Sequence, residues 1–207
     1  MLSYLAIGIL FGVTAGFSPG PLLTLVISET LEHGVGAGIR VALAPIITDI
    51  PIIAITLLVF TQLSDFDTIL GTISLLGGCY VLYIGYESIS AKAHNNRPTE
   101  ERPKSLTRGV LANALSPHPY LFWFSVGAPT TAKAMSINTI APLLFIGGFY
   151  LLLIGSKVGL ALIVGRSKTF LNDRTYGYTM KLLGLALVAF SFVLFADGLK
   201  LLHLLGS

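Results

Sequence analysis

Charged side chains are scarce in this sequence. Only 11% of its 207 residues are Asp, Glu, Lys or Arg, whereas 54% are hydrophobic, and the mean hydropathy is +0.81. A water-soluble domain of this length exposes many more charges, so the composition excludes an ordinary soluble domain. The single cysteine, Cys79, also excludes a disulfide within one chain and a CxxC redox pair.

Long charge-free runs occupy most of the chain. An α-helix needs roughly 20 residues to cross a hydrocarbon core of about 30 Å. Four runs without any charge meet this length, and two more spans are found when one acidic and one basic residue are tolerated in each. The six predicted spans are 2–28, 36–60, 68–86, 109–132, 134–156 and 182–202. The first has no basic residues before it and is too long for a cleaved signal. The sequence therefore predicts an all-α membrane protein with six transmembrane helices.

The basic residues sort by side of the membrane. Ten of the thirteen Lys and Arg fall in three alternate connections, two fall on the opposite side, and Lys157 directly follows the fifth span, in the part of that helix that continues to Gly165. The positive-inside rule assigns the ten to the cytoplasm and places both termini outside. The sequence pI near 9.0 therefore reflects topology in the lipid bilayer and does not predict nucleic-acid binding.

One hydrophilic linker, residues 91–107, divides the predicted helices into two groups of three. The groups are residues 1–90 and 108–207, and together they form a single transmembrane domain. Three spans before the linker mean that the two halves enter the membrane from opposite sides. We therefore expect two inverted three-helix repeats, an architecture that many secondary transporters share.

A Ser-Pro-x-Pro element occurs at equivalent places in the first and fourth predicted helices. The two copies are Ser18, Pro19, Gly20, Pro21 and Ser116, Pro117, His118, Pro119. Each proline removes a backbone N–H and clashes with the preceding turn, so both helices are expected to break there. Irregular backbone survives in hydrocarbon only when it is buried in protein or lines a polar cavity. We expect the two breaks to meet at a cavity near the midplane; simple packing kinks are the alternative.

Four polar residues at membrane depth are further candidates for a site. Asp49 lies about 20 Å along its helix, where it can bind a substrate ammonium, carry a coupling proton, or form a structural ion pair. Lys157 can pair with Asp49, bind a substrate carboxylate, or extend to the cytoplasmic surface. His118 can relay protons or serve in packing, and Asn113 can bond to a neighbouring helix. Glu29 and Glu87 are expected at the interface.

Several stretches in order resemble the LysE/RhtB family of small six-helix exporters. They are GFSPGPLLTLVIS, HGVGAGIRVALAPIITD, LLGGCYVLYIGYESISAK and the element carrying Asn113, Ser116 and Pro117. The resemblance implies export of small solutes, most often amino acids, across the cytoplasmic membrane, driven by a proton gradient or the membrane potential, without a cofactor. Thr48 precedes Asp49 where relatives usually have glycine, and SPHP stands where many have Asn-Pro-Lys. These departures concern the substrate more than the fold.

Other functions remain open from the residues alone. Some distant members of that family handle metal cations, although Cys79, His118 and Asp49 are too few for a tetrahedral metal cage from one subunit. An intramembrane hydrolase would need Ser116 and His118 together with oxyanion donors. A plain channel is a further alternative, and a homodimer is one expectation for the oligomeric state. The protein is not expected to be an enzyme.

Overall fold

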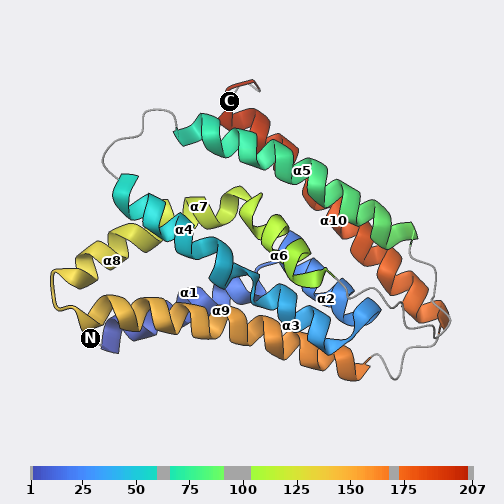
Figure 1. Cartoon of the computed structure of the whole chain (residues 1–207), viewed down its shortest axis with the longest axis horizontal. Helices are drawn as coiled ribbons and strands as arrows, with labels where there is room; N and C mark the ends of the chain where they lie inside the picture. Colours follow the sequence, from blue (N-terminus) through green and yellow to red (C-terminus); the bar gives the residue numbers. More distant parts are fainter. Residues whose placement is uncertain (1, 60–65, 91–103, 168–172, 205–207) are drawn as a thin grey trace.

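The computed structural model describes residues 2–59, 66–90, 104–167 and 173–204, and these residues form helices without any strand (Figure 1). Most of the predicted cytoplasmic linker falls on residues 91–103, outside this set. The elements in chain order are α1 (Leu2–Phe17), α2 (Pro21–His33), α3 (Val35–Ala42), α4 (Ala44–Val59), α5 (Phe66–Ser90), α6 (Ser105–Ala114), α7 (Pro117–Phe122), the π-helical turn η1 (Trp123–Gly127), α8 (Ala128–Met135), α9 (Ile140–Ser167) and α10 (Asp173–Leu201).

Several of these helices can cross a membrane by length and composition. Among the described residues, four qualify: Val35–Ala54, Thr68–Ile89, Ile140–Ser167 and Arg174–Leu201. The pair α1 and α2, bent by 62°, would make a fifth span. The remaining predicted span is divided among α6, α7, η1 and α8, which are each too short to qualify. The structure is therefore that of a multi-pass membrane protein, and the count of six stays a prediction.

Both proline elements interrupt a helix, as predicted. α1 ends at Phe17 and α2 begins at Pro21, while α6 ends at Ala114 and α7 begins at Pro117. Pro21 and Pro117 each occupy the first position of the helix that follows, where a missing N–H removes no helical hydrogen bond. The prolines thus end one helix and start the next.

Two predicted boundaries were wrong. The fifth span was expected at 134–156, but α9 begins at Ile140 because the Asn138 side chain caps it, accepting hydrogen bonds from the backbone N–H of Ile140 (3.0 Å) and Ala141 (2.8 Å). The expected loop after Glu29 is reduced to Gly34, whose φ of 89° is a left-handed conformation that glycine adopts readily. The charge-free runs therefore predicted where these spans lie in the sequence but not the residues at which they begin and end.

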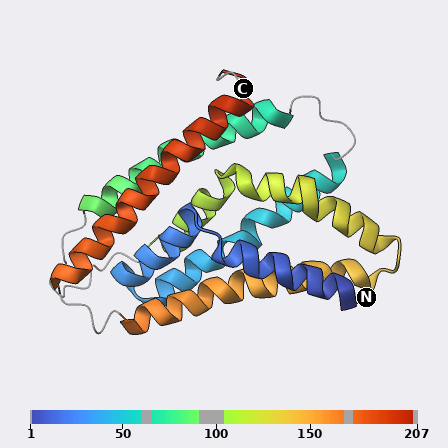
Figure 2. The ribbon, with the colours of Figure 1, turned by 180° about the vertical axis from the view of Figure 1, so that it is seen from behind.

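Two helix pairs form the outer walls. α1 runs along α9 in the same direction, which Figure 2 shows from behind, and α5 runs antiparallel to α10. α6 packs against α3 and α4 between these walls. Glycines line the α1–α9 contact: a Cβ on Gly8 or Gly12 would meet the backbone of Phe145 or Phe149. Small residues of this kind let membrane helices approach closely.

Replacing Gly12 by alanine should therefore destabilise the protein. The new methyl group would lie on the Phe149 carbonyl and 3.0 Å from the Leu152 Cβ, and overpacking of this kind costs about 1–3 kcal/mol. Gly147→Ala is the matched control, because a Cβ on Gly147 meets nothing within 4 Å. We expect a lower melting temperature in detergent for Gly12→Ala only; equal melting temperatures would contradict this packing.

Candidate functional site

Both breaks line a single cavity of about 440 Å³, to which α4, α9 and α10 also contribute. It contains every site residue that the sequence predicted except Pro117, which is buried beside it. The predicted residues that line it are Ser18, Pro19, Gly20, Pro21, Asp49, Asn113, Ser116, His118, Pro119 and Lys157. Their shared role in binding stays a prediction, but the fold brings them to one place.

Lys157 of α9 satisfies two of the carbonyl groups at the first break. In a continuous helix the Ala15 carbonyl would accept a hydrogen bond from the N–H of residue 19, but Pro19 has none. The Lys157 Nζ donates instead to the Ala15 oxygen (3.3 Å) and the Gly16 oxygen (2.9 Å). A cation at the C-terminal end of α1 also complements the helix dipole.

The position of Lys157 bears on the three roles that the sequence allowed for it. Its side chain is 3% exposed and points to α1, so it does not extend to the cytoplasmic surface. Within the described part of the chain it also makes no ion pair with Asp49. An ammonium carries three N–H donors, and two are in use, so one is available to a bound carboxylate.

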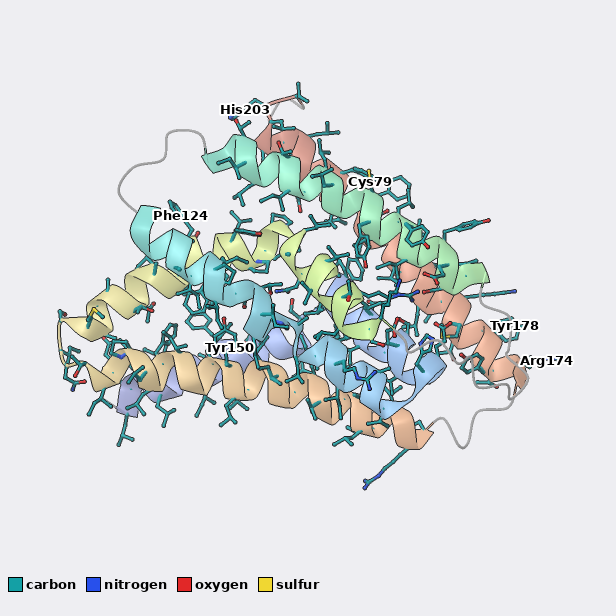
Figure 3. All side chains as sticks on the ribbon, viewed as in Figure 1. Cys79, Phe124, Tyr150, Arg174, Tyr178 and His203 are labelled. Atoms are coloured by element: carbon teal, nitrogen blue, oxygen red, sulfur yellow. The ribbon has the colours of Figure 1, made fainter. Side chains whose placement is uncertain are left out.

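Asp49 of α4 lies at the second break and is 4% exposed. One of its oxygens accepts hydrogen bonds from Asn113 Nδ2 (2.9 Å) and Thr48 Oγ1 (3.1 Å), and the other accepts one from the Tyr150 hydroxyl (3.1 Å). Figure 3 shows Tyr150 on α9, in the region between α9 and α4. The Trp123 indole N–H also interacts with this carboxyl, so the Asp49 side chain is surrounded by polar donors.

The carbonyl groups at the second break are also satisfied. The Ala114 oxygen accepts a hydrogen bond from the Tyr120 hydroxyl (2.9 Å), and the Asn113 oxygen accepts one from the Ser116 N–H (3.2 Å). The Asn113 side chain donates both to Asp49 and to Thr48 Oγ1 (2.6 Å). The amide thus connects the broken helix to α4.

Trp123 closes one side of the cavity. It is 1% exposed, and its indole N–H interacts with the Asp49 carboxyl and the Tyr150 hydroxyl, although it makes no close hydrogen bond among the described residues. It stacks with Tyr150 at a centroid separation of 6.3 Å and meets Phe149 edge-on at 5.7 Å. The indole therefore belongs to the group of donors around Asp49.

Sequence reasoning missed the importance of Tyr150 and Trp123. Aromatic residues in membrane helices serve most often in packing or at the interface, so their identity alone gave no signal. A signal is the spacing on α9, where Tyr150 and Lys157 lie seven residues, about two turns, apart and therefore on similar faces.

Ser116 and His118, the candidates for hydrolysis, do lie together: Ser116 Oγ is 3.1 Å from His118 Nδ1. Side chains two residues apart at the start of a helix often form such a contact, so the pair alone does not indicate catalysis. No acidic partner of His118 is found in the described structure. The described residues also contain no group of three or more His, Cys, Asp or Glu that could hold a metal ion.

A second polar cluster lies where α2, α5 and α6 end or begin. Glu29, expected at the interface, is 1% exposed. It accepts hydrogen bonds from Arg108 Nη1 (3.0 Å) and Ser105 Oγ (2.6 Å), and His33 Nδ1 lies 3.3 Å away. Arg108 Nη2 also binds Glu87 at 2.7 Å. Arg108 therefore joins three helices that are distant in sequence.

A multi-pass helical protein with broken helices around a central polar cavity belongs to the class of membrane transport proteins. The sequence matches the LysE type translocator family over residues 13–198. The chain therefore belongs to the LysE family, whose members are translocators of small solutes and not enzymes. Comparisons with curated proteins and with solved structures give no match.

Lys157→Met should weaken the fold at the first break. The variant keeps the apolar stem but leaves the Ala15 and Gly16 carbonyls without their donor, and each such loss costs about 1–3 kcal/mol. We expect a lower melting temperature and faster proteolysis between α1 and α2. Lys133→Met, on the exposed side of α8, is the control and should change neither measurement.

Arg108→Gln should destabilise the protein because it leaves the Glu29 carboxylate buried without its cation. Removing one partner of a fully buried ion pair costs about 3–5 kcal/mol, and the loss here should be smaller because Arg108 is 26% exposed and His33 still lies 3.3 Å from Glu29. Adding Glu29→Gln to this variant removes the uncompensated charge and should recover part of the loss in a denaturation curve. Arg40→Gln, at an exposed position of α3, is the control. A double variant less stable than Arg108→Gln would contradict this account.

Proposed function

We propose that this protein exports small zwitterionic solutes, most simply amino acids, from the cytoplasm through the cell membrane. One observation carries the proposal: the cavity wall holds a buried carboxylate, Asp49, and a buried ammonium, Lys157, which make no ion pair with each other in the described structure. A solute with an ammonium at one end and a carboxylate at the other would pair with both.

The packing of the helices supports an arrangement as two inverted repeats of three spans. In such a repeat the first span corresponds to the fourth, and the fifth span corresponds to the second. α1 lies along α9, and in the other half α6 contacts α3 and α4, as this correspondence requires. The third and sixth spans correspond to each other, and α5 and α10 form one pair. Both termini would then lie outside the cell.

This arrangement fits transport by alternating access, in which the two halves rock around a central site. Asp49 is the residue for coupling, because a buried carboxylate can bind a substrate ammonium in one state and a proton in another. Transport would then depend on a proton gradient or the membrane potential. A homodimer, the expected oligomeric state, is compatible with this proposal.

Asp49→Asn should reduce gradient-driven amino-acid flux at least tenfold in proteoliposomes, because the amide has no charge for the ammonium or the proton. Tyr150→Phe removes one of the hydrogen bonds to Asp49 and should have a smaller effect. Asp197→Asn is the control, because Asp197 lies on α10 but does not line the cavity. Wild-type flux in Asp49→Asn, or no flux of any amino acid in the unaltered protein, would refute the proposal.

A further inference from the structure

The cavity has little capacity for additional charge. Among its described lining residues, Asp49 and Lys157 are the charged side chains, and His118 is the one other titratable group. In the proposed function the substrate ammonium binds at Asp49 and the carboxylate at Lys157. Both full charges of the wall are then in use, and a third charge on the substrate would find no opposite charge.

The rest of the wall is mostly apolar. Phe149 and Leu153 lie eight and four residues before Lys157 on α9, so the three share one face of that helix. Phe122 of α7 stacks on Phe149 with centroids 4.8 Å apart and planes 10° from parallel. Phe190 of α10 lines the cavity from another helix. A side chain extending from a bound amino acid would contact these rings and methyl groups.

The polar residues of the wall are largely occupied. The Asn113 amide donates to Thr48 and Asp49, and the Ser116 hydroxyl bonds to His118. A polar substrate side chain would therefore meet few free partners, and a charged one would lose its hydration without compensation. An apolar side chain loses nothing and gains burial.

We infer that the substrate is an amino acid of zero net charge with an apolar side chain, such as leucine or phenylalanine, and not a basic or acidic one. The inference rests on the proposed function, because it assumes that Asp49 and Lys157 bind the two charges common to all α-amino acids. It adds that the remaining wall selects the side chain.

A transport panel in proteoliposomes tests this inference. Vesicles with both a proton gradient and a membrane potential are loaded with labelled leucine, phenylalanine, threonine, lysine or glutamate. We expect leucine or phenylalanine flux to exceed lysine and glutamate flux at least tenfold, with threonine between them. Lysine or glutamate flux equal to that of leucine overturns the inference but leaves the proposed function intact. The absence of flux for every amino acid refutes the proposed function itself.

A pair of variants at Phe190 tests the charge count directly. Phe190→Glu adds a carboxylate to the wall, and it should raise the ratio of lysine flux to leucine flux at least tenfold. Phe190→Gln has nearly the same shape as Phe190→Glu without the charge; it also removes the apolar ring, so it should change this ratio, but by far less than Phe190→Glu does. Equal ratios in the two variants would show that charge does not select the substrate. Size-exclusion profiles verify that both variants fold. If either variant misfolds, the transport panel of the unaltered protein tests the inference instead.

Discussion

The structure depends on how hydrogen bonds are supplied to carbonyl groups that proline has deprived of their donors. In the lipid interior water does not supply them, so the protein must. At the first break a lysine from another helix does so, and at the second a tyrosine hydroxyl and a serine N–H do. The polar groups brought in for this purpose surround the cavity. The same prolines that interrupt the helices thus determine where charged side chains can be buried.

The two buried charges are placed in comparable ways. Ala15 and Asn113 lie at matching positions, three residues before Ser18 and Ser116. Ala15 bonds to Lys157 from the fifth predicted span, and Asn113 bonds to Asp49 from the second. Opposite charges therefore contact the ends of the two interrupted helices. Such an arrangement gives a cavity that is electrically neutral as a whole but polar from one side to the other, which suits a zwitterion.

Much of this site could be predicted from the sequence, because the breaks and the buried carboxylate follow from local chemistry. Pro19 and Pro117 interrupt a helix whatever surrounds them, and Asp49 stands out in an apolar segment. The partner of Lys157 could not be predicted, since it depends on α1 lying along α9. Burial of Glu29 was also missed, because its partner Arg108 is 79 residues away. The start of α9 was misplaced because Asn138 is uncharged and its capping role is visible only in the fold.

The glycine contact between α1 and α9 has a mechanical consequence. The backbones of the two helices are in contact at Gly8 and Gly12, and Lys157 of α9 is hydrogen-bonded to the end of α1. The two helices therefore form one rigid unit, which can act as a lever. Ser18 and Pro19 lie outside both helices, and the first helical hydrogen bond of α2 is the one that the Gly20 carbonyl accepts from the Thr24 N–H. A tilt of this lever would therefore pivot at Ser18–Gly20 and carry the ammonium of Lys157 toward or away from Asp49. The distance between the two charges would change with every swing.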